Sequence, residues 1–305
     1  MEKLKAIIIG PWNIFNKAYL PFIFNLEELN IVGIVGRSEE KLIKYKEKYG
    51  CDVYTHIEEA IKLKPDCAFV HTSTESHYEI VKKLLESGIH VYVDKPIAEE
   101  IDKTKELINL AMDKPLILKV GFNRRYAPMY RKALALFEGL KPEFCIMEKN
   151  RHNDIKNSVK FTLYDDFIHV VDTLCYIIKD VESIEVNMSK EEDSLKYIEV
   201  VLKSHNSTAI GVMHRNSGKD YERLEIHGHS NSAIVEDMES AKIMDNGKIA
   251  IYNFGSWDTT SYRRGFETAV KSFLKDVLEG NNVNDELKCT LKSHEIIEEI
   301  LKKAL

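Results

Sequence analysis

Three polar side chains stand at helical spacing in the segment Tyr164–Asp172, where Asp165, His169 and Asp172 are four and three residues apart. On a helix these positions share one face. A carboxylate one turn from an imidazole can hold the tautomer of that ring while its other nitrogen exchanges a proton with a substrate. The spacing therefore indicates general acid–base chemistry, with Asp165 and His169 as catalytic candidates and Asp172 as a substrate-side candidate.

Two other roles for His169 remain open, a hydrogen-bonded structural histidine and a metal ligand. The metal site is disfavoured because the trio lacks a clear fourth ligand and the pair His227 and His229 lies on a separate segment. We expect no metal.

A lysine follows the apolar run at residues 90–93, in the order Val93-Asp94-Lys95-Pro96. The carboxyl ends of strands are where open α/β sheets bind ligands. A lone lysine at a strand end is usually solvated, but one followed by proline and facing a cofactor cleft can orient or protonate a carbonyl oxygen. Lys95 is therefore the third catalytic candidate.

The turn after the first apolar run reads Gly10-Pro11-Trp12-Asn13-Ile14-Phe15. In a doubly wound sheet this turn usually carries G-x-G-x-x-G and holds a dinucleotide diphosphate against a helix N-terminus. Gly10 retains the first glycine, whereas Trp12 and Phe15 replace the second and third. We expect Gly10, Trp12, Asn13 and Ile14 to lie along a cofactor, with an ordinary α/β turn as the alternative.

The second apolar run ends in Gly36-Arg37-Ser38, about 20 residues beyond the turn, where a carboxylate would bind the ribose of NAD. No carboxylate stands there. Arg37 and Ser38 leave room for a 2′-phosphate and supply a cation for it, which favours NADP over NAD. The alternative is that Ser38 caps the next helix while Arg37 is solvated.

Short β-rich apolar runs alternate with helical periodicity over the first 120 residues, which is typical of βαβ units. The five runs occupy residues 4–10, 30–35, 66–72, 90–96 and 116–122. Runs this continuous in Val and Ile predict strands buried on both faces, in a parallel sheet covered by helices. Residues 1–121 are therefore expected to form a Rossmann domain with a doubly wound parallel sheet.

After Gly121 the pattern changes to one helical stretch around Asp165–Ile178, then consecutive strand-like segments, then two closing helices. Short turns such as Asn246-Gly247 predict antiparallel pairing. The expected strands are Val181–Met188, Tyr197–Lys203, Thr208–His214, Tyr221–His227, Ala233–Asp237, Ala241–Met244 and Lys248–Phe254. Residues 122–305 are thus expected to form an α+β domain with an open, mainly antiparallel sheet, whose uncovered face favours a homo-oligomer.

The 305 residues are 44% hydrophobic and 30% charged, which is ordinary globular composition. The net charge of -6 disfavours nucleic acid and anionic membrane surfaces as partners. Five scattered cysteines without a CxxC pair suit a reducing compartment, and no apolar stretch approaches the length of a membrane span. We expect a cytoplasmic protein that acts on a small molecule.

With these motifs in place, the sequence resembles the Gfo/Idh/MocA oxidoreductases, the family of glucose-fructose oxidoreductase and inositol dehydrogenase, over nearly its whole length. The resemblance is carried by Asn13-Ile14, Lys17–Pro21, Thr72–His77, Gly88–Val91, Asp94-Lys95-Pro96, Gly121–Arg125 and Asp165–Asp172. It is closest to the MviM branch, on VDKPIAE, VGFNRRYAPMY, LYDDFIHVVDTL, MHRNSG and RRGFE.

The resemblance implies catalytic roles for Lys95, Asp165 and His169 and NADP or NAD as cofactor. It also implies that Gly10, Arg37 and Ser38 lie along the cofactor. The further expected cofactor-side positions are Thr72, Ser73 and His77, at and after the end of the third run, and Lys95 in the fourth. The chain departs from the family pattern at three positions, with Phe167 and Trp12 in place of glycine and Asp94 in place of glutamate.

Together these features predict hydride transfer between NADP(H) and a secondary alcohol or ketone of a small polyol, sugar or sugar-like acid. His169 would exchange the hydroxyl proton of the substrate, Asp165 would orient the His169 ring, and Lys95 would polarise the substrate oxygen. Four residues are candidates for binding an anionic group of the substrate, namely Arg124, Arg125, His152 and Arg215. Asp172 is a further substrate-side candidate. The alternative is a non-catalytic nucleotide-binding sensor or scaffold with a degraded glycine loop.

Overall fold

The computed structural model describes residues 3–304, and these form two compact units. Unit 1 comprises the residues up to Gly121 together with Phe266–Lys288, and unit 2 comprises Phe122–Gly265 together with the residues from Cys289 onward. The expected second domain, 122–305, differs from this division because part of the C-terminal region belongs to unit 1. In the described part of the chain, no helix has both the length and the apolar composition needed to cross a membrane.

Unit 1 is built on a six-stranded parallel sheet in the order β3-β2-β1-β4-β5-β6. Its strands are β1 (Leu4–Ile9), β2 (Leu29–Val35), β3 (Asp52–Tyr54), β4 (Cys67–Val70), β5 (His90–Val93) and β6 (Leu118–Val120). All four residues of β4 are buried, as expected for a strand covered on both faces. The Rossmann prediction is confirmed, and only the short strand β3 was missed.

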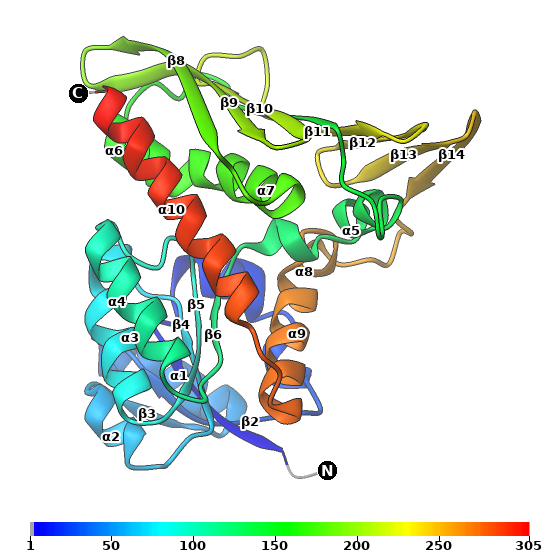
Figure 1. Ribbon diagram of the computed structural model, residues 1–305. Coiled ribbons are helices and arrows are strands. Elements are labelled where there is room, and N and C mark those ends of the chain that lie inside the picture. Colours follow the sequence, from blue (N-terminus) through cyan, green and yellow to red (C-terminus); the bar gives the residue numbers. More distant parts are fainter. Residues whose placement is uncertain (1–2, 305) are drawn as a thin grey trace. The chain divides into compact units, whose positions relative to one another are not determined.

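Helices cover both faces of this sheet. They are α1 (Glu39–Tyr49), α2 (Ile57–Ile61), α3 (His77–Glu86), α4 (Ile101–Met112) and α9 (Phe266–Glu279). Figure 1 shows α3 and α4 on one side of β5 and α9 on the other. Helix α9 belongs to unit 1 because Phe273 packs its ring 5.6 Å from that of Phe69 and 5.8 Å from that of Tyr92.

Unit 2 holds an eight-stranded sheet in the order β14-β13-β12-β11-β7-β10-β9-β8. Its strands are β7 (Phe144–Asn150), β8 (Ser183–Glu191), β9 (Ser194–Ser204), β10 (Ser207–His214), β11 (Tyr221–Gly228), β12 (Asn231–Glu236), β13 (Ser240–Asp245) and β14 (Lys248–Asn253). Strands β7 and β10 pair in parallel and the other neighbours are antiparallel. The expected open, mainly antiparallel sheet is confirmed, and β7 is the strand that sequence analysis missed.

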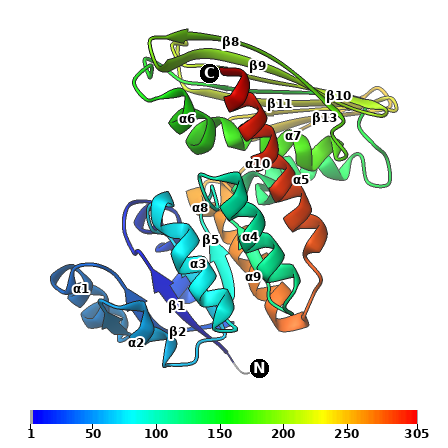
Figure 2. The ribbon, with the colours of Figure 1, turned by 60° about the vertical axis from the view of Figure 1, so that its left-hand side comes forward.

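The helices of unit 2 are α5 (Pro128–Ala135), α6 (Val159–Thr162), α7 (Ile168–Ile178), α8 (Thr260–Arg263) and most of α10 (Asn284–Ala304). Figure 2 shows α6 and α7 on one face of the sheet, while the other face carries no helix among the described residues. Alternate residues of β10 and β11 are buried, as this arrangement requires. A Cβ on Gly211 would lie 2.8 Å from Val170, so glycine lets α7 approach β10 closely.

The core of unit 2 contains a buried histidine on α10 whose titration makes a testable contribution to stability. His294 is fully buried, with Nδ1 2.8 Å from the carbonyl oxygen of Thr290, and burial lowers its pKa to about 4. The unfolded chain, with a histidine pKa of about 6.5, binds more protons between these values, so stability falls as the pH drops through that window. We expect this histidine alone to cost about 2 kcal/mol of unfolding free energy between pH 7 and pH 5.

Urea unfolding at the two pH values tests this expectation. His294→Gln should show a smaller loss than the native chain, whereas His205→Gln, on an exposed turn, should not change the loss. Equal losses in all three proteins would contradict the assignment to His294.

Candidate functional site

The turn after β1 brings the backbone of Gly10 against the loop that follows β4. Gly10 has a φ of +78°, and a Cβ placed on it would lie 2.6 Å from Cγ2 of Thr72 and 2.8 Å from the Thr72 backbone nitrogen. Only glycine combines this backbone conformation with so close an approach. The first glycine of the loop is therefore retained for a physical reason.

Above this turn lies a cavity of about 630 Å³ at the carboxyl ends of β1, β2 and β4. Ligands bind at this edge of doubly wound sheets. Of the expected cofactor-side residues, seven line the cavity: Gly10, Trp12, Asn13, Ile14, Arg37, Thr72 and Ser73. Ser38, His77 and Lys95 are not among its lining residues.

Ser38 and His77 have structural partners in unit 1. The Ser38 hydroxyl accepts a hydrogen bond from the backbone nitrogen of Lys41 and caps α1, which was the alternative role considered for it. The ring nitrogens of buried His77 lie 2.8 Å from the carbonyl oxygen of Pro96 and 3.1 Å from that of Thr72. Burial lowers the pKa of His77, and the ring ties the loop after β4 to the loop after β5.

Trp12 is half-buried in the wall of the cavity, where the loop usually has a glycine. Its ring lies 3.2 Å from the place that a Cβ on Gly36 would occupy. The ammonium groups of Lys41 and Lys44 lie 6.0 and 5.9 Å from its centroid. Trp12 therefore brings an aromatic ring to the side of the cavity next to Gly36, with two cations beside it.

The cavity wall also contains buried polar atoms that suit a nicotinamide dinucleotide. Nε2 of His71 and Oγ1 of Thr72 are buried and have no hydrogen-bond partner among the described residues. Both residues line the cavity, next to the close backbone approach at Gly10. A ribose hydroxyl can donate to Nε2 of His71 and a phosphate or ribose oxygen can accept from the Thr72 hydroxyl, so the residues present fit the cofactor.

His71 also organises the carboxylate that precedes Lys95. Its Nδ1 lies 2.9 Å from Oδ2 of Asp94, and the Tyr19 hydroxyl donates to Oδ1 of Asp94 at 2.7 Å. Burial would raise the pKa of Asp94, but the charge of His71 and these hydrogen bonds outweigh burial and lower it. Asp94 is thus an anion fixed at the end of β5, directly before Lys95.

Sequence analysis did not single out His71 or Tyr19. The available signal was the position of His71 directly after the apolar strand β4, next to the strand that ends at Asp94. Carboxyl ends of neighbouring parallel strands meet at one edge of a sheet, so the pairing of His71 with Asp94 could have been inferred.

In unit 2 the predicted helix that carries Asp165 and His169 contains an irregular turn. Residues Leu163–Phe167 form a π-helical turn between α6 and α7, and such turns occur frequently at functional sites. Asp165 is exposed, His169 is half-buried, and the carbonyl oxygen of His169 accepts a hydrogen bond from Thr173. The π-turn therefore separates the helix that precedes Asp165 from the helix that begins just before His169.

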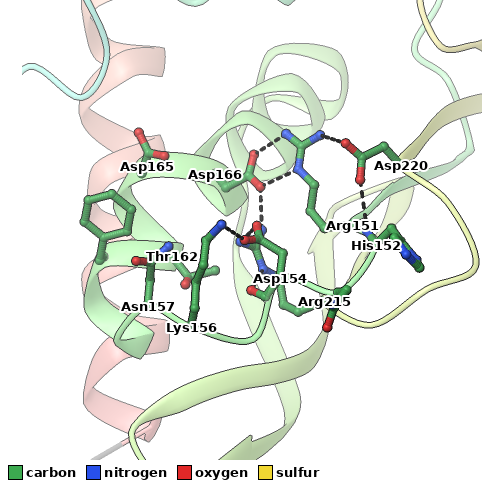
Figure 3. Close-up of a pocket in the computed structure, with 12 residues that line it drawn as sticks. Arg151, His152, Asp154, Lys156, Asn157, Thr162, Asp165, Asp166, Arg215 and Asp220 are labelled. Carbon is green, nitrogen blue, oxygen red and sulfur yellow. Dashed lines mark hydrogen bonds and ion pairs between the residues drawn. The ribbon is translucent and has the colours of Figure 1, made fainter.

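Next to this turn lies a second cavity, of about 490 Å³, lined almost entirely by polar side chains. Its lining residues are Arg151, His152, Asn153, Asp154, Lys156, Asn157, Phe161, Thr162, Asp165, Asp166, Arg215 and Asp220. Figure 3 shows Asp165 pointing away from the ion-paired cluster that Asp166 joins. Asp165, His152 and Arg215 are the expected site residues that this cavity brings together.

Asp166 is the centre of this cluster. Lys149 lies 3.0 Å from its Oδ1, Arg215 lies 2.5 Å from its Oδ2, and Arg151 contacts both oxygens at 3.0 and 2.9 Å. Burial would raise the pKa of Asp166, but the nearby cations hold it far below its usual range. Burial and the nearby Arg124 lower the pKa of Lys149 to about 8, so Lys149 is still mostly charged at neutral pH.

Three of the expected substrate-side residues lie in the interior of unit 2 and do not line the cavity. Nε of Arg125 donates to Asp172 at 3.0 Å, and Asp172 also accepts a hydrogen bond from Ser293. Nε and Nη2 of Arg124 contact Glu222 at 2.8 and 2.5 Å. The charges of both arginines are matched internally, so a substrate-binding role for Arg124, Arg125 and Asp172 stays a prediction.

Comparison with known proteins agrees with the two-unit architecture. Residues 4–122 match an oxidoreductase family with an NAD-binding Rossmann fold, and residues 128–246 match the C-terminal domain of YceM-like proteins. YceM of Salmonella typhimurium, a protein named as an oxidoreductase, is 31% identical over 282 residues, which cover 90% of this chain and 89% of that protein.

Two further similarities extend over most of the chain. The crystal structure of a dehydrogenase, MviM, from Clostridium difficile superposes with a TM-score of 0.89 at 32% identity, covering 99% of this chain and all of that one. Myo-inositol 2-dehydrogenase of Thermotoga maritima is 23% identical over 271 residues, which cover 79% of each chain.

Proposed function

The chain belongs to the Gfo/Idh/MocA family of oxidoreductases, and from that premise we propose that it transfers a hydride between NADP(H) and a secondary alcohol or ketone. The proposed substrate is a small polyol, sugar or sugar-like acid, a choice supported by the name of the myo-inositol dehydrogenase relative. The observation that carries the proposal is the cavity over Gly10, where Nε2 of His71 and Oγ1 of Thr72 are buried polar atoms without a hydrogen-bond partner among the described residues.

The bound nicotinamide would supply the redox chemistry, by accepting or giving the hydride. His169 exchanges the hydroxyl proton of the substrate, and Asp165 orients the proton-exchanging group. Lys95 polarises the substrate oxygen. Asp94, which His71 and Tyr19 hold as an anion, directly precedes Lys95 at the end of β5.

We propose NADP as the preferred cofactor because Arg37 lines the cavity at the end of β2, and Gly36, Arg37 and Ser38 stand directly after Val35 in place of an acidic residue. Arg37 is exposed at the cavity, where it can pair with a 2′-phosphate. Lys41 and Lys44, near Trp12, add positive charge on the same side.

The cofactor preference is tested by thermal unfolding with each nucleotide. At equal concentration NADP should raise the Tm more than NAD, because binding to the native state alone stabilises by mass action. Arg37→Ala should remove most of the difference, whereas Lys62→Ala, an exposed change in the same unit, should preserve it. Equal shifts in the native chain, or a larger shift with NAD, would rule out the NADP preference.

We also propose a cytoplasmic homo-oligomer that contacts its copies through the sheet of unit 2. The face of the sheet without a helix supports this, as do Ile249 and Ile251 on the edge strand β14, which are 62% and 68% exposed. The cytoplasmic location is supported by the buried thiols of Cys51, Cys67, Cys145 and Cys175.

A nucleotide-binding sensor or scaffold is the second candidate function. The observation that favours it is Trp12, whose ring stands in the cavity wall where the loop of a dinucleotide enzyme usually has glycine. Turnover of the nicotinamide separates the two functions, because a sensor binds the nucleotide without hydride transfer.

A further inference from the structure

The cations that line the cavity of unit 2 are already matched by carboxylates of the same unit. Nη1 of Arg215 lies 2.5 Å from Oδ2 of Asp166, and its Nη2 pairs with Asp154. The ammonium of Lys156 lies 2.6 Å from Oδ1 of Asp154. The carboxylates of Asp154 and Asp166 therefore already pair with both of these cations (Figure 3).

The third lining cation, Arg151, makes a two-pronged contact with Asp166 through Nε and Nη2. Its remaining Nη1 lies 3.6 Å from Asp220. Such paired contacts fix the plane of the guanidinium group, and the carboxylate also balances its positive charge. The lining thus contains three cations, Arg151, Lys156 and Arg215, against four carboxylates, Asp154, Asp165, Asp166 and Asp220, and Lys149 beside Asp166 supplies a fourth cation, so the cluster holds no excess positive charge for an anion.

An entering carboxylate or phosphate would meet this arrangement at a disadvantage. To reach Arg215, which is 4% exposed at its side chain, it would have to displace Asp154 or Asp166. The displaced carboxylate would then remain in the cavity without its partner, and like charges in a confined site repel.

An uncharged hydroxylated group meets no such cost. Hydroxyl groups both donate and accept, so they can pair with the amides of Asn153 and Asn157 and with outer carboxylate oxygens. Phe161, 50% exposed, adds an aromatic face for the C–H side of a sugar ring.

We infer that the cavity of unit 2 takes an uncharged polyhydroxylated group, a sugar ring or a polyol chain, and excludes a carboxylate or phosphate. This inference rests on the proposed dehydrogenase function. It narrows the proposed substrates from sugars, polyols and sugar acids to the neutral members of that set.

The test compares pairs of sugars that differ only at C6, where one member has a hydroxymethyl group and the other a carboxylate, with the full chain and NADP. The pairs are D-glucose with D-glucuronate and D-galactose with D-galacturonate. For any ring that is turned over, the neutral member should have a kcat/KM about tenfold or more above that of its acid. Equal or better use of the acids would overturn the inference while leaving the dehydrogenase function intact.

A variant tests the cause of the discrimination. Asp154→Asn removes the carboxylate from Nη2 of Arg215 and from Lys156, so it should raise kcat/KM for the acids by about tenfold, the scale of one charge-assisted contact. Asp180→Asn, at a side chain 80% exposed in the same unit, should leave the ratio unchanged. An unchanged ratio in a folded Asp154→Asn would overturn the explanation by matched charge.

A third outcome separates this inference from the function on which it rests. If NADP binds and neither these pairs nor a wider panel of neutral sugars and polyols is turned over, the dehydrogenase function fails and the inference fails with it. If only the acids are turned over, the inference alone fails.

Discussion

Alanine at Lys95 or at His169 is expected to lower kcat by about a hundredfold or more, the usual scale for losing a positioned acid or base. Cofactor affinity should change much less, because neither side chain lines the cavity over Gly10. Asp165→Asn should give a defect that does not add to that of His169→Ala, since the two groups are proposed to act as a unit. The measurement is steady-state kinetics on the first substrate found in the screen of neutral sugars and polyols.

Two control variants distinguish the loss of a catalytic group from a general loss of folded structure. Lys62→Ala changes an exposed lysine of unit 1, and His205→Ala changes an exposed histidine of unit 2. Both should keep kcat near that of the native chain. Near-native kcat in the Lys95 and His169 variants would show that the proposed mechanism is wrong, even with the fold correct.

Asp166→Ala is expected to lower the free energy of unfolding by about 3–5 kcal/mol, because it leaves buried cations without their shared carboxylate. Lys149 is 5% exposed and Arg215 is 4% exposed at the side chain, so water compensates little for the lost partner. Urea unfolding should show a lower midpoint with an unchanged slope.

A double variant tests that the loss comes from unmatched charge. Lys149→Met combined with Asp166→Ala removes one of the cations left unmatched, so the double variant should be more stable than Asp166→Ala alone. Asp180→Ala, at an exposed carboxylate, should change stability by less than about 0.5 kcal/mol. Additive losses in the double variant would contradict the role given to Asp166.

The same carboxylate predicts a direction for acid unfolding. Because the pKa of Asp166 lies below its value in the unfolded chain, its contribution to stability is present above that unfolded value and is lost as the pH falls through the folded one. Glu222, whose pKa Arg124 and Lys149 lower to about 2 against the opposing effect of burial, adds to the same loss. Stability should therefore decline below about pH 4, the unfolded carboxylate range.

The sequence was sufficient to predict the parallel sheet of unit 1 and most strands of unit 2, because a buried strand shows as a run or an alternation of apolar residues in the sequence. Strand β7 was missed because Glu148 and Lys149 make it look polar. Lys149 is nevertheless buried, since Asp166 and Glu222 match its charge from other segments. Local pattern does not reveal such long-range pairing.

The same limit applies to the division of the chain and to the candidate site. Helix α9 was expected in the second domain because it follows in sequence, but its buried Phe273 packs in unit 1. The motif residues Gly10 and Arg37 line the cavity at the carboxyl ends of β1, β2 and β4, and their cofactor role stays a prediction. Asp166 and His71 were missed because their roles arise from contacts with residues far along the chain.

The most direct test of the proposed function is hydride transfer itself. The native chain and the Lys95→Ala variant are each incubated with NADP and a panel of neutral sugars and polyols. Reduction of the nicotinamide is followed by absorbance. We predict reduction by the native chain with at least one member of the panel, and a rate lower by about a hundredfold or more with Lys95→Ala. Tight NADP binding without reduction across the whole panel would contradict the dehydrogenase function and favour the nucleotide-binding sensor.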